Sequence, residues 1–168
     1  MYGFVVRMGQ GVEWTLHVLL TLAWLDDEEP VTVAQLATGH DLPAPYLNKQ
    51  LQALARAGIL ESTPGARGGF RLARPAASIS LMDVVVAVEG TQDAFRCTEI
   101  RQQGVGGDLP RSAFDAPCAI SASMRRAELA WRRELAGQTV ADVRDEADRH
   151  APGARDATRR AYGRQPVD

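Results

Sequence analysis

The first third of the chain opens with an apolar pattern of helical period. Residues 1–7 are expected to form a short extended lead. After Gly11, apolar residues recur at helical spacing as far as residue 25: Val12, Leu16, Leu19, Leu20 and Ala23. This stretch is too short to cross a bilayer comfortably, and it carries Glu13 and His17 near its start. We therefore expect residues 12–25 to form a helix of a globular domain.

Two further helices joined by a short turn are predicted next. Thr32 and Gln35 form a capping box that starts a helix ending near residue 38, and Gly39 and His40 make the turn. Prolines are tolerated in the first turn of a helix, so residues 43–58 form a third helix with an apolar inward face: Tyr46, Leu47, Leu51 and Leu54. This arrangement is a helix-turn-helix.

A β-hairpin is predicted after the third helix, with strands at residues 59–63 and 70–72. Helix-turn-helix and hairpin together make a winged helix, whose third helix enters the DNA major groove. We expect DNA contacts from exposed positions of these elements: Thr32, Pro45, Tyr46, Asn48, Lys49, Gln52, Arg56, Arg67, Gly68, Gly69 and Arg71. Lys49 is the only lysine in the chain, and Gly68 and Gly69 would let the backbone approach a groove closely. The alternative interpretation of these charges is an ordinary solvated face.

The second half alternates between helices and irregular segments. Residues 78–89 predict a helix that Gly90 ends, and residues 91–116 form a long loop rich in glycine. Residues 117–136 predict a long helix with one apolar side, followed by a short helix at residues 139–143. The long helix has little to pack against within one domain, which favours a homodimer. From residue 144 onward, charge and small residues indicate a disordered or loosely helical tail.

These elements predict a mainly α-helical fold with a small β-hairpin wing. Residues 1–90 form a winged helix-turn-helix domain, 91–118 a ligand-bearing loop, 119–143 a dimerisation helix with a short final helix, and 144–168 a tail. The length of 168 residues suits one domain with an appendage. A net charge of −2 argues against broad nucleic-acid affinity, so local basic clusters must supply it. Without a recognisable export signal, we expect a cytoplasmic protein that does not insert into membranes.

Four side chains stand out as candidate metal ligands. Glu13 and His17 are four residues apart, so a helix places them on one face. The only two cysteines, Cys97 and Cys118, bracket the glycine-rich loop, with a spacing too wide for a zinc knuckle. Taken singly, each has an ordinary explanation: a surface carboxylate, a half-buried histidine and two buried thiols. Together they offer one carboxylate, one imidazole and two thiolates.

Several motifs, in their order along the chain, carry a resemblance to a known family: Gly11-Val12-Glu13-Trp14, Tyr46-Leu47-x-Lys49-Gln50-Leu51, Gly68-Gly69-Phe70-x-Leu72, Leu81-x-Asp83-Val84-Val85-x-Ala87-Val88-Glu89-Gly90, the cysteine loop, and Trp131 before Thr139-Val140-Ala141-Asp142-Val143. Over about residues 6–143 the chain resembles the Rrf-type transcription regulators, which include IscR, NsrR and RsrR. The resemblance implies a homodimeric winged-helix regulator of double-stranded DNA, often with an iron-sulfur cluster that sets DNA affinity.

The usual family pattern has three cysteines in the loop, whereas this chain has two. In this respect the sequence is more similar to the redox-sensing RsrR type. That resemblance implies a 2Fe-2S cluster ligated by Glu13 and His17 of one subunit and by Cys97 and Cys118 of the other. Trp14 and His40 are candidate relays from the cluster to the DNA-binding helices, although a core tryptophan and a helix-capping histidine explain them as well.

Other functions remain open at this stage. A regulator without a cluster could sense oxidants through a disulfide between Cys97 and Cys118. A winged helix could instead bind a protein partner. A metal-dependent hydrolase is the least favoured class, because no second acid-base pair accompanies Glu13 and His17. We therefore do not expect an enzyme.

Overall fold

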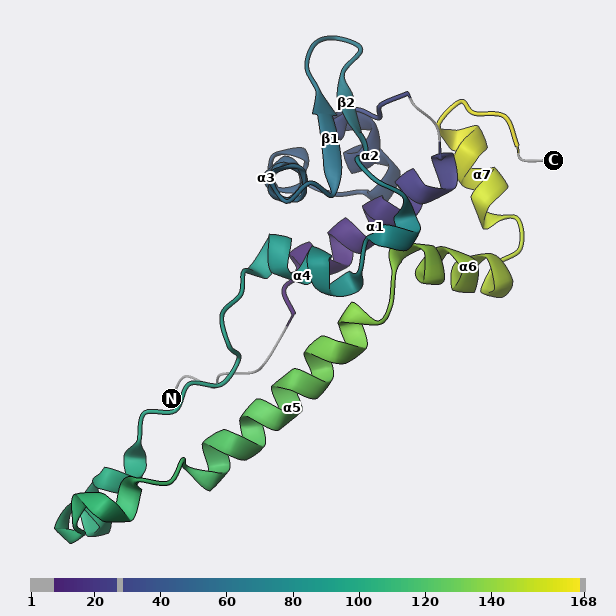
Figure 1. The fold of residues 1–168 in the computed structure, drawn as a ribbon. Coiled ribbons are helices and arrows are strands. Elements are labelled where there is room, and N and C mark those ends of the chain that lie inside the picture. The colour runs from purple at the N-terminus through teal and green to yellow at the C-terminus, as the bar shows by residue number, and fades with distance from the viewer. Residues whose placement is uncertain (1–7, 27–28, 167–168) are drawn as a thin grey trace. The chain divides into compact units, whose positions relative to one another are not determined.

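The structure, a computed structural model, describes residues 8–26 and 29–166, so the predicted extended lead lies outside the described residues. The chain forms two compact units, one from Met1–Gly90 with Leu135–Asp168 and one from Thr91–Glu134. Figure 1 labels the helices and strands of both. The predicted fold class, mainly helical with a two-stranded wing, is confirmed.

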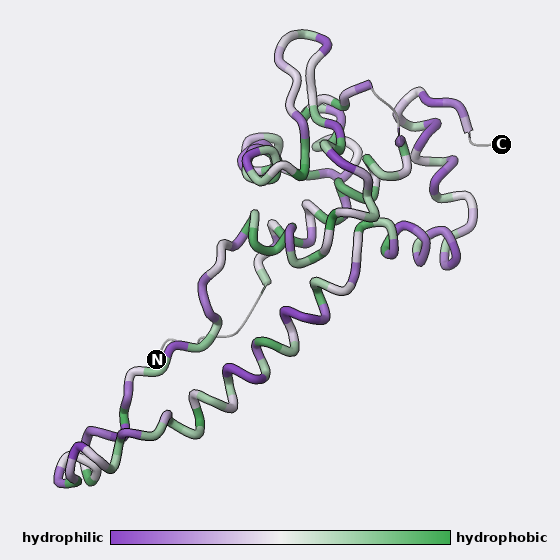
Figure 2. Tube along the Cα trace, viewed as in Figure 1, coloured by the Kyte–Doolittle hydropathy of each residue, from purple (hydrophilic) through white to green (hydrophobic). Residues whose placement is uncertain are grey.

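Helix α1 (Gln10–Leu25) is the centre of the larger unit and contacts α3, α4, α6 and α7. Its side chains Val18, Leu19 and Leu25 are almost completely buried. This burial explains why α1 is apolar over most of its surface, with exposed polar positions confined to its first half. Figure 2 shows the contrast with α6 and α7, whose traces are largely hydrophilic.

The helix-turn-helix consists of α2 (Val33–His40) and α3 (Ala44–Arg56). The predicted capping box is present: the Thr32 hydroxyl accepts the Gln35 N–H at 3.2 Å, and the Gln35 side chain accepts the Thr32 N–H at 3.0 Å. The prediction of a turn at Gly39 and His40 is wrong. Both residues belong to α2, and the turn begins at Asp41, which adopts a left-handed conformation with φ 52°.

The wing is formed by β1 (Leu60–Thr63) and β2 (Gly69–Leu72), which pair antiparallel with Leu60 opposite Leu72. Val31, just before α2, exchanges two backbone hydrogen bonds with Phe70, of 2.9 and 2.8 Å. Gly69 has φ 154°, and a Cβ there would overlap the backbone of Val31. Close packing of the wing against the helix-turn-helix therefore explains Gly69.

Helix α4 (Leu81–Glu89) follows a short 3₁₀ turn at Ala76–Ser78 and begins at a capping box formed by Ser80 and Asp83. The segment that leads into α6 is held beside the start of α4 by two backbone hydrogen bonds. Leu81 N donates to Gln138 O and Val140 N donates to Ile79 O, each at 2.9 Å. Helix α4 and the start of α6 are thereby tied to the same core.

The C-terminal segment requires a correction. Helix α6 extends over Val140–His150, well beyond the predicted residue 143, and α7 (Ala154–Ala161) follows it. Both helices contact α1. The tail is therefore not disordered over residues 144–166. Helical periodicity of apolar residues missed it because these helices are mostly polar and are held by specific hydrogen bonds.

The smaller unit contains most of the long helix α5 (Ala119–Ala136) and the loop before it. The loop is not wholly irregular, since it includes 3₁₀ turns at Ile100–Gln102, Gly104–Asp108 and Arg111–Phe114. Helix α5 leaves four large apolar side chains exposed in this single chain: Ile120, Met124, Leu129 and Trp131. No helix within residues 8–26 and 29–166 is both long and apolar enough to span a membrane.

Candidate DNA-reading surface and metal ligands

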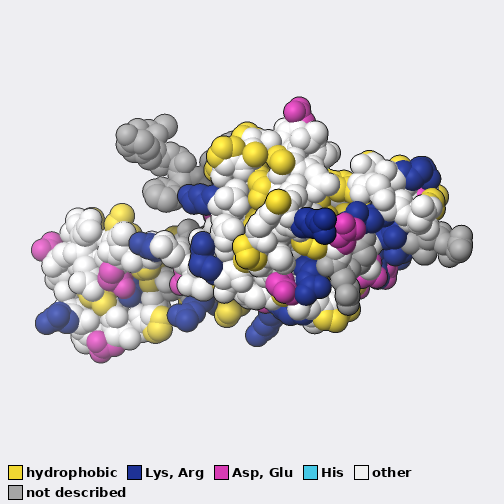
Figure 3. Space-filling view, turned by 90° about the horizontal axis from the view of Figure 1, so that it is seen from above, with side chains coloured by type: hydrophobic (Ala, Val, Ile, Leu, Met, Phe, Trp, Pro, Cys, Tyr) yellow, Lys and Arg dark blue, Asp and Glu magenta, His cyan; other side chains and the backbone are white. Residues whose placement is uncertain are grey.

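Helix α3 presents the polar face that the sequence predicts. Leu47, Leu51 and Leu54 are buried, whereas the four outward polar positions are all exposed: Asn48, Lys49, Gln52 and Arg56. Pro45 and Tyr46 at its start are also exposed. Viewed from the side of the wing, basic side chains lie interspersed with acidic ones (Figure 3). This side of the molecule is therefore of mixed charge, and α3 contributes two exposed basic side chains to it, Lys49 and Arg56.

The wing arginines differ in their availability. Arg67 lies exposed in the turn. Arg71 is paired across the strands with Glu61, at 2.9 Å, and Arg74 is paired with Asp83 at 3.1 Å. The side chain of Thr32 is engaged in the capping box. Gly68 is buried. Arg71, Thr32 and Gly68 therefore have structural roles in the free protein, and a role at DNA stays a prediction for them as it does for Arg67.

Glu13 and His17 are both exposed on α1, one helical turn apart. His17 faces His40 of α2, with ring centroids 6.3 Å apart. His40 Nε2 lies 3.1 Å from the hydroxyl of Thr21, a buried residue of α1. Burial, and secondarily the charge of His17, lower the pKa of His40 below 6.5. The neutral form of His40 is therefore favoured at this position, beside one of the candidate ligands.

Trp14 joins this face of α1 to the recognition helix. Its ring meets that of Tyr46 edge to face, with centroids 5.1 Å apart. Trp14 is half-buried, and Tyr46 is 44% exposed. The two candidate relay residues thus make different contacts: Trp14 touches α3, whereas His40 touches the middle of α1.

The two cysteines lie near each other in the smaller unit. Cys118 precedes α5, and the backbone N–H groups of Ser121 and Ile120, together with the charge of Arg101, lower the pKa of its thiol. Exposed Cys97 lines a cavity of about 430 Å³ with Ser121. The pKa of Arg101 is raised first by its bond to Glu99 and then by attraction to both cysteines. Both thiols therefore lie within the electrostatic influence of Arg101, and Cys97 shares its cavity with Ser121, which follows Cys118 closely in the chain.

The four candidate ligands fall into two pairs. Glu13 and His17 belong to the larger unit, and Cys97 and Cys118 to the smaller. Among residues 8–26 and 29–166 of this single chain, no group of three or more His, Cys, Asp and Glu side chains forms a metal site. Each pair is therefore an incomplete ligand set by itself.

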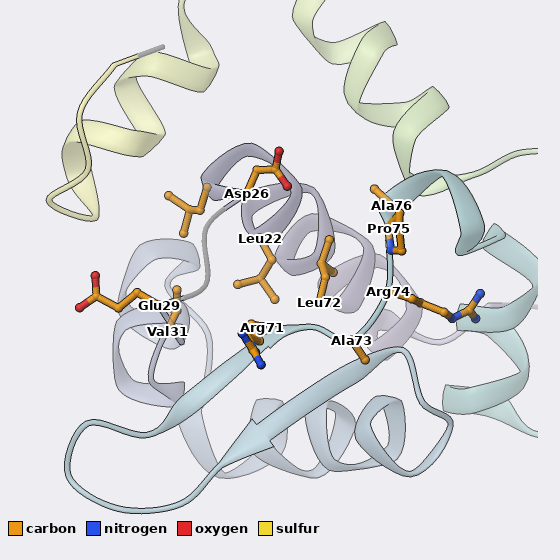
Figure 4. A pocket seen from close by; sticks show the side chains of 11 residues that line it. Leu22, Asp26, Glu29, Val31, Arg71, Leu72, Ala73, Arg74, Pro75 and Ala76 are labelled. Atoms are coloured by element: carbon orange, nitrogen blue, oxygen red, sulfur yellow. The ribbon is translucent and has the colours of Figure 1, made fainter.

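A second cavity, of about 370 Å³, lies between the end of α1 and the base of the wing (Figure 4). Leu22, Val31 and Leu72 supply apolar walls, and Asp26 and Arg71 lie at its edge. Sequence reasoning missed this hollow, because its walls come from segments separated by the whole helix-turn-helix. No local motif points to it.

A helix-turn-helix followed by a packed two-stranded wing defines a winged-helix DNA-binding protein. Within this class, residues 8–146 match the Rrf2 family, described as "Iron-dependent Transcriptional regulator", and the chain belongs to that family. Its relatives are transcription regulators and not enzymes, in agreement with the sequence analysis.

Two relatives and one solved structure illustrate the similarity. YffB of Lactococcus lactis, described as a candidate HTH-type transcriptional regulator, is 31% identical over 141 residues, covering 84% of this chain and 88% of YffB. The HTH-type transcriptional regulator IscR of Cereibacter sphaeroides is 37% identical over 93 residues, covering 55% of this chain and 60% of IscR. The structure of T. potens IscR superposes with a TM-score of 0.64 and 21% identity, covering 86% of this chain and 90% of that one, and supports the fold.

Proposed function

We propose that this protein is a cytoplasmic, homodimeric transcription regulator whose affinity for DNA responds to redox state through a 2Fe-2S cluster. The observation that carries the proposal is that exposed Cys97 lines the same cavity as Ser121, whose backbone N–H favours the thiolate of Cys118. A family described as iron-dependent supports iron as the metal. The exposed Glu13 and His17 supply the remaining donors.

The donor set fits the chemistry of such a cluster. Cys97 and Cys118 would hold one iron as thiolates, and Glu13 and His17 would hold the other. A bound 2Fe-2S cluster supplies a one-electron redox couple, and histidine ligation raises its potential relative to an all-cysteine site. The N–H groups of Ser121 and Ile120 stabilise the Cys118 thiolate, and their loss would disfavour ligation. Glu13 and His17 are exposed and need no unfolding to reach a metal.

We assign the two pairs to different subunits of a dimer. The exposed apolar side of α5, with Met124 and Trp131, supports dimerisation, because a long helix with a bare apolar stripe is stabilised by a partner. A two-fold dimer would carry two clusters and place two copies of α3 on successive half-sites of an operator. The exposed Asn48, Lys49, Gln52 and Arg56 would contact it.

A change of charge at Glu13 and His17 would reach α3 through neighbouring side chains. Trp14 follows Glu13 directly and contacts Tyr46 in the first turn of α3. A displacement of α1 would therefore require Tyr46 to repack. DNA affinity changes only if the operator fits the two arrangements differently.

Anaerobic purification with an absorption spectrum and counts of iron and acid-labile sulfide tests the ligands. We expect about two irons per chain, and loss of iron and colour in Glu13→Ala, His17→Ala, Cys97→Ser and Cys118→Ser. Gln10→Ala, an exposed position on the same helix, is the matched control and should retain both. Full iron occupancy in the His17 and Glu13 variants would contradict this ligand set.

Titration of DNA with oxidised and with reduced protein tests the switch. Equal affinity in both states would contradict redox sensing. The cluster-free alternative is a disulfide between Cys97 and Cys118. A colourless protein whose DNA binding responds to oxidants, and which loses this response in the Cys97→Ser variant, would support it.

A further inference from the structure

The C-terminal helix α7 adds a basic partner to the end of α1, where Asp26 N–H caps only the carbonyl of Leu22. The last turn of α1 has no basic residue to interact with its free carbonyl groups. Arg159 of α7 instead donates from Nη1 to the carbonyl of Trp24, at 3.0 Å, and to that of Leu25. The indole N–H of Trp24 in turn donates to Asp148 of α6, at 2.8 Å. These contacts bring a positive side chain to the negative end of α1.

The residue that follows α7, Tyr162, lies against a glycine of α2. Gly39 lies in the last turn of α2, where glycine is normally unfavourable. A Cβ at this position would overlap the hydroxyl of Tyr162, which directly follows α7. Within the described residues that hydroxyl is buried without a hydrogen-bond partner, and burial raises the pKa of Tyr162. Packing therefore holds the ring of Tyr162 in place. The absence of a side chain at Gly39 leaves room for the hydroxyl group of this tyrosine.

A third contact fixes the end of the segment. Arg164 forms an ion pair with Glu29 at 3.1 Å, in the connection between α1 and α2. The contacts made by Arg159, Tyr162 and Arg164 thus fall on the end of α1, on α2 and on the link between them. All three residues lie beyond residue 146, where the match to the Rrf2 family ends.

We propose that residues 147–166 form an intramolecular clamp that sets the position of α2 against α1 and so controls the geometry of the helix-turn-helix. The clamp acts next to the contact between His40 and Thr21, because Gly39 directly precedes His40. It does not depend on metal binding. Figure 1 shows α7, in yellow, beside α1.

A double-mutant cycle between Gly39 and Tyr162 tests the clamp in the full chain. In the Tyr162→Ala background, Gly39→Ala should raise Tm by about 2–4 °C, because alanine is the better helix former. With Tyr162 present, the added methyl group displaces the ring, and the same substitution should give no increase or a decrease. Thermal unfolding followed by circular dichroism measures both shifts. An equal increase in both backgrounds would overturn the proposal.

Hydrogen exchange provides a second readout with a matched control. Arg159→Gln should increase exchange at the last turn of α1 and in α2 by several-fold, since the carbonyls of Trp24 and Leu25 lose their partner. Arg160→Gln changes an exposed arginine on the same helix and should leave these amides unchanged. Unchanged exchange in the Arg159 variant, or an equal increase in both variants, would also overturn the clamp.

Discussion

Trp14 and Tyr46 meet edge to face, with ring centroids 5.1 Å apart and ring planes at 79°. This contact connects two helices of different function: α1, which carries Glu13 and His17, and α3, which carries the predicted DNA-reading side chains. Aromatic pairs of this geometry contribute about 0.5–1.5 kcal/mol beyond the area they bury. A displacement of Trp14 would therefore change the packing of Tyr46 at the start of α3.

Trp14→Ala should weaken redox control more than DNA binding itself. Removing the contact lowers the coupling between α1 and α3, so the ratio of DNA affinities of oxidised and reduced protein should fall by about 2–10-fold. Parallel DNA titrations of the two states measure this ratio. Trp14→Phe keeps a ring against Tyr46 and should retain most of it. An unchanged ratio in Trp14→Ala, with the cluster intact, would exclude this route.

Cys118 should be an unusually reactive thiol in metal-free protein. The N–H of Ser121 chiefly, then that of Ile120 and the charge of Arg101, favour its thiolate and lower its pKa below 9.0. In the Cys97→Ser variant, the rate of alkylation should therefore reach half its maximum at a lower pH than for an ordinary cysteine.

Arg101→Gln should shift this profile back toward higher pH, since one attractive charge is lost. Arg111→Gln, an exposed arginine of the same unit, should leave the profile unchanged. A profile in the Cys97→Ser protein equal to that of free cysteine would contradict the stabilisation by backbone N–H groups.

Local sequence pattern predicted the winged helix because each element has its own signal. The capping box of Thr32 and Gln35 lies where it was expected, and the apolar spacing of Leu47, Leu51 and Leu54 gave the buried face of α3. The same reasoning did not predict the full length of α6 or the presence of α7, because these helices are polar. They are held in part by the hydrogen bond between Trp24 and Asp148, which are 124 residues apart. Contacts of such separation leave no local period.

For the candidate site, too, the sequence predicted local features and not the contacts between distant residues. The four-residue spacing of Glu13 and His17 fixed their common helix face. That Cys97 lines one cavity with Ser121, near Cys118, depends on the path of the intervening loop, which spacing does not reveal. The role of Gly39 depends on Tyr162, more than a hundred residues later, so α2 alone gave no reason for it.

The protein should lose stability as the pH falls through the range in which histidine titrates. Burial and the charge of His17 lower the pKa of His40, so the folded state binds fewer protons than the unfolded chain. Stability therefore falls as pH drops below the ordinary value of 6.5, and the loss continues until pH passes the lowered pKa. Thermal unfolding of metal-free protein between pH 7.5 and 5 checks this, and the Tm should be lower at the acidic end.

His40→Gln should flatten that dependence, because it removes the group whose pKa differs between the two states. His150→Gln replaces an exposed histidine of α6 and serves as the control. Equal pH dependence in wild type and His40→Gln would show that the titration of His40 does not govern stability.

The salt dependence of DNA binding should separate contacts to phosphate from structural pairs. Lys49 is exposed on α3, and Lys49→Ala should reduce the slope of log affinity against log salt by about one. Arg149, on the exposed surface of α6 and paired with Glu146, is outside the helix-turn-helix, and Arg149→Ala should leave the slope unchanged.

Arg71 allows a more specific test, since it is paired with Glu61 in the free protein. If Arg71 contacts phosphate, Glu61→Gln removes the competing ion pair and should raise affinity by about 2–5-fold at low salt, an effect typical of an exposed ion pair. Loss of that gain in the double variant Glu61→Gln/Arg71→Gln would assign it to Arg71, whereas the same gain in both would assign it to the removal of a negative charge from the wing.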